Sequence, residues 1–444
     1  MVHRAKRVFI AAGAMARPAA ALILVLALAL PGAASAAKQT ADHPATFATD
    51  WLNLIVERVK AEGYSPLVAS RIYAYSGVTL YEVVVPGMPD HQSLAGQLHE
   101  LPALPQPAPG ARLDWPAVAS AALAGLSKDL FPNASAASLL AFRDLFANHN
   151  LSRIRANVPR QVLIDSRAHG NRVADAILAW AATDGYATTR NQPYVPPIGP
   201  DQWVPTGGST NPLPLEPFWG SLRTFALPSV QTCAAPPPVA YSEDPESAFY
   251  QEALAVYQAG VDNTAETRLI AHFWADNPRQ TGLPPGHSVR IATQHVQDLD
   301  LGSAAEAYAL VGIAVGDAFI SCWYEKYLYN LLRPETYIQR FIDPTWRPLI
   351  ATPPFPEYTS GHSVQSGATN VVLAALFGDG PFVDSTHAAR GLAPRPFDSL
   401  TAAFEEAAIS RLYGGIHYPM GIDDGVPQGR CVGQAVLDEV QTRK

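Results

Sequence analysis

Three short segments in the C-terminal half of the chain carry side chains suited to holding a tetrahedral oxyanion. The first is Lys326-YLYNLL-Arg333. Because seven residues return a helix almost to the same azimuth, the spacing predicts that Lys326 and Arg333 project from one helix face, about two turns apart. A lone Lys and Arg pair is usually a solvated basic face. Here the neighbouring aromatic residues, Trp323 among them, argue against a purely solvated helix.

The second segment, TSGHSVQSGATNVVLAALFG, places Ser360, Gly361 and His362 directly before a helical pattern. The start of a helix offers unpaired amides and the positive end of the helix dipole, which together bind anions. Gly361 has no side chain to prevent close approach of the backbone. The alternative interpretation is an ordinary Ser N-cap followed by a surface histidine.

In the third segment, Ser410-Arg411-LYGGI-His417, a helical pattern is interrupted by two glycines and then reaches a histidine. Arg411 carries a permanent charge and can grip two oxygens at once. His417 can act as a nucleophile or as a metal ligand. The alternative is a partly buried histidine whose hydrogen bonds are satisfied, which is the usual state of a lone histidine.

Together the segments resemble, in order and spacing, the signature shared by vanadium haloperoxidases and PAP2-type acid phosphatases: K-x6-R-P, P-S-G-H and S-R-x5-H-x3-D. The motifs cover residues 326–417 directly. HFWADNP, which begins at His272, and the N-terminal helical block are similar to bacterial vanadium haloperoxidase-type proteins over most of the remaining chain.

Two positions depart from this signature. Thr359 replaces the Pro of P-S-G-H, and Gly421 replaces the final Asp. In the family that carboxylate helps to orient the last histidine, as acids behind a metal-ligating histidine commonly do. Either a nearby acid, Asp423 or Asp424, substitutes for it, or His417 is held differently.

The resemblance implies a role for each residue of the three segments. Three cations, a hydroxyl and a backbone amide would hold the equatorial oxygens of vanadate or phosphate: Lys326, Arg333, Arg411, Ser360 and Gly361. His417 would be the axial ligand of vanadate, and His362 would lie opposite as the group that moves protons. The implied cofactor is vanadate, and haem is not expected because the chain has no CxxCH sequence.

The same pocket serves two reactions in the family, because five-coordinate vanadate mimics the transition state of phosphoryl transfer. A haloperoxidase would oxidise halide with hydrogen peroxide, whereas an acid phosphatase would form a phosphohistidine on His417 and needs no cofactor. Trp323 and Phe355 stand where similar haloperoxidases carry aromatic residues at the halide site, although both could equally be core aromatics. With the chain length and FPEYTSGHS, they favour the haloperoxidase. A third alternative is a non-catalytic exported protein that binds oxyanions.

The secondary structure expected around these segments is helical throughout. Apolar residues recur at helical spacing from Phe47, in residues 116–126, 162–183, 364–377 and 398–413, and again in residues 428–440. Two capping boxes, Asn263-x-x-Glu266 and Ser303-x-x-Glu306, predict helix starts, and the second opens a long helix over about residues 304–332. No strand alternation is evident, so the predicted fold class is all-α, with two packed helical bundles.

The predicted organisation has four parts. Residues 1–36 form a secretory signal peptide, with a basic start, an apolar stretch and the cleavage pattern Ala34-Ser35-Ala36. Residues 37–190 form the N-terminal bundle and residues 241–444 the C-terminal bundle with the oxyanion site. Between them lies a Pro- and Gly-rich connecting segment, residues 191–240. The expected location is therefore the periplasm or the exterior of the cell.

Composition narrows the partners. Without residues 1–36 the chain has 27 basic and 39 acidic residues, a formal net charge of −12, which disfavours nucleic acid. No apolar stretch beyond the signal peptide is expected to span a bilayer. Three cysteines allow at most one disulfide. The expected partners are small molecules, namely hydrogen peroxide, halide and an organic acceptor, or a phosphomonoester, and no oligomeric state is inferred.

Overall fold

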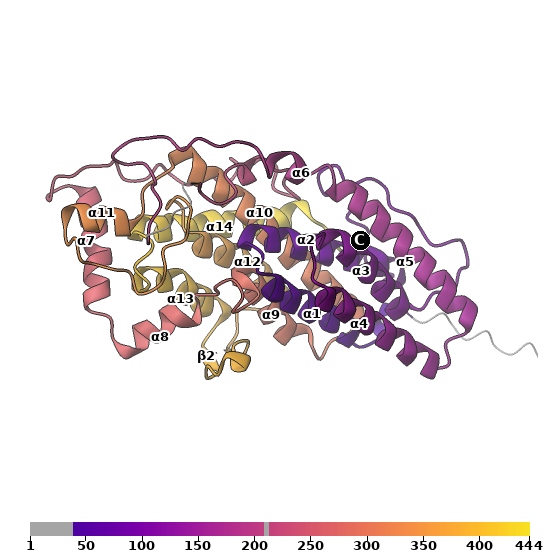
Figure 1. Ribbon diagram of the computed structural model, residues 1–444. Helices are drawn as coiled ribbons and strands as arrows, with labels where there is room; N and C mark the ends of the chain where they lie inside the picture. Colours follow the sequence, from indigo (N-terminus) through magenta and orange to yellow (C-terminus); the bar gives the residue numbers. More distant parts are fainter. Residues whose placement is uncertain (1–38, 208–212) are drawn as a thin grey trace, which may run out of the picture. The chain divides into compact units, whose positions relative to one another are not determined.

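The computed structural model describes residues 39–207 and 213–444, and the predicted signal peptide, residues 1–36, lies outside them. Helices dominate these residues (Figure 1), so the all-α prediction is confirmed. The α-helices are α1 (Thr46–Glu62), α2 (Pro66–Val84), α3 (Trp115–Leu130), α4 (Ala136–Arg155), α5 (Arg160–Ala181), α6 (Tyr186–Thr189), α7 (Ala248–Val261), α8 (Ala265–Phe273), α9 (Leu283–Val296), α10 (Leu301–Tyr329), α11 (Pro334–Phe341), α12 (Gly361–Phe377), α13 (Leu400–Tyr413) and α14 (Pro419–Glu439).

Short elements complete the described chain. Single 3-10 turns occur at Thr40–Asp42, Val85–Gly87, Trp219–Ser221 and Ala388–Arg390. Strands β1 (Phe382–Asp384) and β2 (Arg395–Phe397) pair antiparallel, with Phe382 opposite Phe397. The sequence patterns predict neither this hairpin nor α4. Each strand has only three residues, and α4 buries only three side chains along its length, so neither element produces a clear hydrophobic period.

The long helix α10 lies at the centre of the described unit, between α2 and α12 (Figure 1). Glycines allow the backbones of α2 and α10 to approach each other closely. A Cβ atom on Gly77 of α2 would lie 2.2 Å from the carbonyl oxygen of Tyr308, and one on Gly312 of α10 would lie 2.9 Å from that of Tyr73. Any larger residue at these two positions would force the helices apart.

Three details of this region differ from the sequence-based expectation. Helix α10 is capped by Asp300, whose carboxylate accepts hydrogen bonds from the amides of Gly302 (2.8 Å) and Ser303 (3.1 Å), so Ser303 lies inside the helix. Helix α8 is capped by Thr264 rather than Asn263, because Thr264 and Thr267 form the reciprocal capping pair. The predicted cap residues therefore lie close to the observed ones: Asn263 is one position from Thr264, and Ser303 is three positions from Asp300.

The third detail concerns length. Among the described residues, α10 alone is long and apolar enough to cross a membrane by length and composition, although no apolar stretch beyond the signal peptide was expected to span a bilayer. The whole of its apolar window is buried inside the protein, as expected of a central core helix. Buried Asp317 in this helix accepts hydrogen bonds from the amides of Phe225, Ala226 and Leu227 and so anchors the connecting segment to α10.

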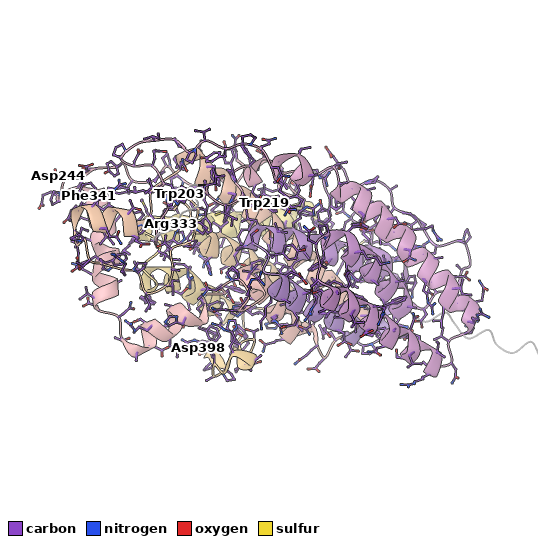
Figure 2. All side chains as sticks on the ribbon, in the orientation of Figure 1. Trp203, Trp219, Asp244, Arg333, Phe341 and Asp398 are labelled. Carbon is purple, nitrogen blue, oxygen red and sulfur yellow. A yellow bond between two sulfur atoms is a disulfide. The ribbon has the colours of Figure 1, made fainter. Side chains whose placement is uncertain are left out.

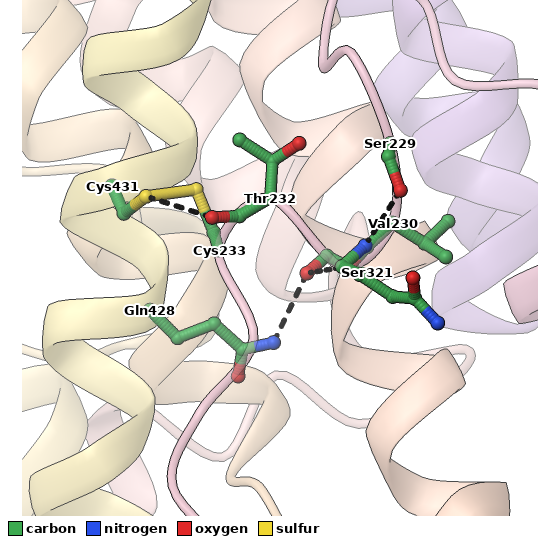
Figure 3. The surroundings of a disulfide bond; sticks show 8 residues. Ser229, Val230, Thr232, Cys233, Ser321, Gln428 and Cys431 are labelled. Atoms are coloured by element: carbon green, nitrogen blue, oxygen red, sulfur yellow. Dashed lines mark hydrogen bonds between the residues drawn. A yellow bond between two sulfur atoms is a disulfide. The ribbon is translucent and has the colours of Figure 1, made fainter.

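Where the structure describes it, the connecting segment of residues 191–240 is irregular apart from one 3-10 turn and an isolated bridge between Gln202 and Leu331. A disulfide between Cys233 and Cys431 joins it to α14, as Figure 3 shows, and closes a loop across 198 positions. Next to the disulfide, the side-chain amide of Gln428 on α14 donates to the hydroxyl of Ser321 on α10. Residues 38–444 form one compact unit, and the predicted division of these residues into two bundles remains a prediction.

The disulfide leads to a prediction about stability. Replacing both cysteines, Cys233→Ser with Cys431→Ser, should lower the free energy of unfolding by about 2–5 kcal/mol, because the unfolded chain gains the freedom of a very long loop. Urea unfolding followed by circular dichroism measures this change. A reducing agent should destabilise the wild-type protein by a similar amount and leave the double variant unaffected. An equal effect of the reductant on both proteins would contradict the assignment.

Candidate active site

Two of the three predicted segments line one cavity of about 440 Å³, and Lys326 and Arg333 of the first segment lie against Phe355 in its wall. Arg411 at the end of α13, His417 in the loop before α14, and His362 in the first turn of α12 all line this cavity. The other charged and hydroxyl groups of the predicted set do not line it but are buried in contact with residues that do. Figure 2 labels one of these, Arg333, within the packed interior.

Lys326 and Arg333 come together in a way the spacing did not predict. Helix α10 ends at Tyr329, because Asn330 adopts the left-handed conformation (φ 50°) that terminates helices. Arg333 is therefore not on the helix of Lys326 but immediately precedes α11. Both cations lie over the ring of Phe355, with Lys326 Nζ 5.2 Å and Arg333 Cζ 4.8 Å from its centre. A turn, and not a shared helix face, brings them to the same site.

The Lys326 ammonium organises the segment before α12. It is completely buried, and its Nζ donates to the backbone carbonyls of Pro356, Glu357 and Thr359. An ammonium has three N–H donors, so these carbonyls use all of them. Burial lowers the pKa of Lys326 to about 8. In this arrangement Lys326 contributes positive charge to the site and fixes the backbone that leads to Ser360.

Arg333 keeps one donor group without a partner. Its Nε donates to the carbonyl of Phe355 (2.8 Å), and Nη1 donates to the carbonyl of Ile416 (2.8 Å) and lies 3.2 Å from His417 Nε2. Nη2 is buried and has no hydrogen-bond partner among the described residues. Leaving a guanidinium N–H unpaired in the interior is costly, so an acceptor such as an oxyanion would fit there.

The N-terminus of α12 is built as the sequence predicts. Ser360 is the N-cap residue, and its hydroxyl accepts a hydrogen bond from the amide of Ser363 at 3.3 Å. The Ser360 hydroxyl can still donate its own proton. Gly361 lines the cavity, and a Cβ atom there would be in ordinary contact with Trp323 at 3.5 Å. The first amides of this helix have no carbonyl partners within it, so they supply the donors that an anion needs.

His417 is oriented by a carboxylate that the sequence analysis did not identify. Its Nδ1 lies 2.7 Å from Glu357 Oε1, which also accepts from the amide of Tyr418. Asp424 instead accepts from the hydroxyl of Tyr358. The structure thus supports the second of the two alternatives, in which His417 is held differently. With Nδ1 donating to the carboxylate, Nε2 carries the lone pair, which faces Arg333 Nη1 at 3.2 Å and is the atom that could bind a ligand.

The absence of a side chain at Gly421 leaves room for Glu357 to supply the carboxylate that contacts His417. A Cβ atom at Gly421 would lie 2.5 Å from Glu357 Oε1 and 2.9 Å from Oε2, so the Glu357 carboxylate occupies the space beside this glycine. Burial raises the pKa of Glu357 to about 7, against the opposing effect of Lys326 and Arg333. The only sequence signal for this role was the presence of an acid in FPEYTSGHS, three residues before the helix cap.

The second histidine is held by the HFWADNP segment. His362 Nε2 lies 2.9 Å from the carbonyl oxygen of Trp274, which can only accept, so Nε2 carries a proton and Nδ1 has the free lone pair. Arg411 Nη2 donates to the carbonyl of Ala271 at 3.2 Å. Burial lowers the pKa of His362 well below its ordinary value, and the charge of Arg411 adds to this effect. His362 is therefore a neutral proton acceptor facing the cavity.

The two candidate halide-site aromatics are neighbours in the wall. Trp323 and Phe355 both line the cavity, and their ring centres are 4.8 Å apart. The indole N–H of Trp323 donates to the carbonyl of Leu215 at 3.2 Å, which leaves the ring face as an apolar surface. These rings separate part of the cavity from the buried charge of Lys326, which lies 5.5 Å from the Trp323 ring.

A second buried cluster lies behind the HFWADNP segment. His287 is enclosed by two carboxylates, with Nδ1 2.8 Å from Asp276 Oδ2 and Nε2 2.8 Å from Asp384 Oδ2. These two acids raise the pKa of His287 to about 10, although burial opposes them. The Trp274 ring stacks on the imidazole at 4.6 Å. The imidazolium therefore holds the segment that contacts His362 and Arg411.

This cluster also has the spacing of a metal-binding group. Ligand atoms of Asp276, His287 and His387 lie within 4.8 Å of one another. Both ring nitrogens of His287 already contact carboxylates, however, so a buried ion-pair chain accounts for its geometry. No role for this cluster follows from the sequence, because no short motif joins Asp276 of HFWADNP to His287 and His387.

The fold and the site together define a helical protein with a buried anion-binding centre. A sequence profile described as "VCPO second helical-bundle domain" matches residues 306–443. Vanadium chloroperoxidase from Curvularia inaequalis is 26% identical over 275 residues, which span 46% of this chain and 45% of that relative. The structure of "the first bacterial vanadium dependant iodoperoxidase" superimposes with a TM-score of 0.83 at 38% identity, covering 90% of this chain and 97% of the other. An apo-type bacterial vanadium-dependent chloroperoxidase shares the fold, with a TM-score of 0.64 at 15% identity over 85% of this chain and 95% of its own.

The chain belongs to the vanadium haloperoxidase family, whose members are peroxidases. The resemblance inferred from the motifs is thereby confirmed.

The buried imidazolium gives a prediction with a defined pH window. His287→Ala should lower the free energy of unfolding by about 3–5 kcal/mol, because it leaves Asp276 and Asp384 buried without their shared cation. The contribution of His287 is complete below its unfolded pKa of about 6.5 and is lost as the pH rises toward 10, its folded value. The pKa values of both acids are lowered, so their contribution is lost as the pH falls below about 4.

Urea unfolding of wild type and variant between pH 5 and pH 10 measures this difference, which should be largest near pH 6 and shrink above it. His295→Ala is the matched control, since this histidine also stacks on an aromatic ring, that of Phe377, but has no carboxylate partner among the described residues. A constant difference across the pH range would exclude the ion-pair chain as its origin.

Proposed function

We propose that this protein is a vanadium-dependent haloperoxidase that oxidises halide with hydrogen peroxide. The observation that carries the proposal is His417, whose Nδ1 proton is directed to Glu357 while Nε2 faces the guanidinium of Arg333. Burial lowers the pKa of His417 well below its ordinary value, and the charges of Arg333 and Lys326 add to this effect. The ring is therefore neutral and has a lone pair at the centre of the cationic site.

The residues present fit a vanadate ion. His417 Nε2 would be its protein ligand, and the unpaired Nη2 of Arg333, the guanidinium of Arg411, the Ser360 hydroxyl and the Gly361 amide would hold its oxygens. Lys326 would add charge from behind the wall. When bound, vanadate supplies a Lewis acid that activates peroxide for attack by halide. The remaining chemistry belongs to the side chains.

His362 is proposed to move the proton of the incoming peroxide. Its Nδ1 lone pair is free because Nε2 donates to the carbonyl of Trp274, and its low pKa keeps the ring neutral at physiological pH. The same nitrogen can return the proton to the departing oxygen. Trp323 and Phe355 are proposed to exclude water from the halide, which strengthens its interaction with the nearby cations.

Iodide is the halide proposed first, because the bacterial relative at 38% identity is described as an iodoperoxidase. We also propose that the protein is exported to the periplasm or the exterior. The signal-peptide pattern in residues 1–36 supports this location, and the Cys233–Cys431 disulfide is consistent with an oxidising compartment.

The function is tested with purified protein, with and without added vanadate. Iodide and bromide oxidation by peroxide should require vanadate, while hydrolysis of a phosphomonoester should be negligible by comparison.

His417→Ala should abolish vanadate binding measured by equilibrium dialysis. His362→Ala should retain binding and slow turnover by roughly 10²–10⁴-fold, the usual contribution of a general acid–base group. Phosphomonoester hydrolysis without vanadate-dependent halide oxidation would instead indicate an acid phosphatase.

A separate prediction concerns the carboxylate behind His417. Glu357→Gln should weaken vanadate binding by about 10–100-fold, because the neutral amide is a poorer acceptor for Nδ1–H and makes Nε2 a weaker donor to the metal. Equilibrium dialysis with vanadate measures the dissociation constant directly. Asp424→Asn is the matched control, since this acid of α14 accepts from the hydroxyl of Tyr358 and does not contact His417. Equal losses in the two variants would show that Glu357 has no particular role.

A further inference from the structure

Helix α4 carries apolar side chains on the face that points away from the protein. It packs on α1 and α3 at the edge of the described unit (Figure 1), and Phe142 lies on its buried face. Successive helical residues are about 100° apart, so Leu140, Leu151 and Ile154 lie on the opposite face. Their side chains are 45%, 43% and 54% exposed. Together with exposed Ala147 between them, these residues form the outer stripe of α4.

Buried polar contacts fix the orientation of α4. Arg153 Nη2 donates to Asp114 Oδ2 at 2.7 Å, and His149 Nε2 lies 3.1 Å from Asp50 Oδ2. A rotation of the helix that buried the outer stripe would break both contacts. The outer stripe is therefore a permanent part of the protein surface.

Arginines accompany the outer stripe. Residues 136–172, which cover α4 and the first half of α5, contain six arginines and two aspartates, a formal net charge of +4. The chain without residues 1–36 carries −12, so its remainder carries −16. Arg153 is paired with Asp114, but Arg155 and Arg160 are exposed and have no ion-pair partner among the described residues. The junction of α4 and α5 is thus a basic region on an acidic protein.

Charge and apolar character together distinguish the partners that would cover this surface. A second copy of the chain would pair the stripe with itself about a two-fold axis, which would also bring two basic regions together. An acidic polysaccharide would match the charge but would gain little from leucine and isoleucine side chains. An anionic bilayer matches both properties, because its headgroups attract arginines and its acyl boundary accepts apolar side chains.

We propose that α4 and the start of α5 dock the protein on the surface of an anionic phospholipid bilayer. The outer stripe, about 21 Å long at about 1.5 Å per residue, lies at the boundary between headgroups and acyl chains. Arg155 and Arg160 lie among the lipid phosphates. The helix rests on the bilayer and does not cross it, because its other face is held against the protein by His149 and Arg153. This inference does not depend on the haloperoxidase function.

Binding is measured by sedimentation with large vesicles that contain phosphatidylglycerol and phosphatidylcholine in equal parts. The protein used is residues 38–444, which form one compact unit, so that the apolar stretch of residues 1–36 makes no contribution. The wild-type protein should sediment with these vesicles and bind at least about tenfold more weakly to vesicles of phosphatidylcholine alone. High salt should release it, because salt screens exposed charges.

Two double variants separate the charged and apolar contributions. Arg155→Gln with Arg160→Gln should weaken binding about 25-fold, because each cation near an anionic surface strengthens binding about fivefold. Leu151→Ser with Ile154→Ser should weaken it at least about tenfold, because two half-exposed apolar side chains no longer enter the acyl boundary. All four positions are exposed, so circular dichroism should show the wild-type fold.

Matched controls make the same kinds of change at exposed positions of α7, α8 and α11. They are Arg268→Gln with Arg340→Gln, and Val261→Ser with Leu269→Ser, and both should bind vesicles as the wild-type protein does. Equal losses in the controls, or no binding of the wild-type protein to the mixed vesicles, would overturn the proposal. A dimer in sedimentation velocity without lipid that the Leu151 and Ile154 variant dissociates would assign the stripe to a second copy and would also overturn it.

Discussion

The burial of three cations beside one another is the constraint on which the rest of the site depends. Lys326, Arg333 and Arg411 are each at most 1% exposed, and burial lowers the pKa of each of them. Such charges are tolerated in the interior only when hydrogen bonds and opposite charge compensate for lost hydration. Backbone carbonyls from segments far apart in sequence provide most of this compensation. Glu357 provides negative charge near Lys326 and Arg333, and Asp276 provides it near Arg411. The donors left over are available to an anion.

This constraint explains which parts of the site could be predicted. The cap at Ser360 and the helix after it follow from local preferences, so they were predictable from a few adjacent residues. The geometry of Lys326 and Arg333 was not, because it depends on Asn330 adopting a left-handed conformation that its neighbours in sequence do not require. The residues that the motif spacing selected do meet in the structure, but the assumption that Lys326 and Arg333 share one helix was wrong. Binding an anion requires particular side-chain types, but it does not require that these side chains lie on one helix.

The helices were predictable from the spacing of apolar residues, whereas the buried polar contacts that join distant segments were not. Contacts such as Asp317 with the amides of residues 225–227, or His287 with Asp276 and Asp384, join residues 90 or more positions apart or bridge separate segments. No pattern within a short window distinguishes such an acid or histidine from a surface residue. These buried polar groups connect the wall of the cavity to the helices, and their contacts are visible in the structure but not in the sequence.

The relation between Gly421 and Glu357 restricts how this branch of the family can change over time. The carboxylate that serves His417 comes from position 357, and it occupies the space that a side chain at position 421 would need. A lineage that exchanged these acids one at a time would pass through a protein with either two carboxyl groups competing for one space or none at all. The two positions are therefore expected to be inherited as a pair, which makes them a compact marker of ancestry.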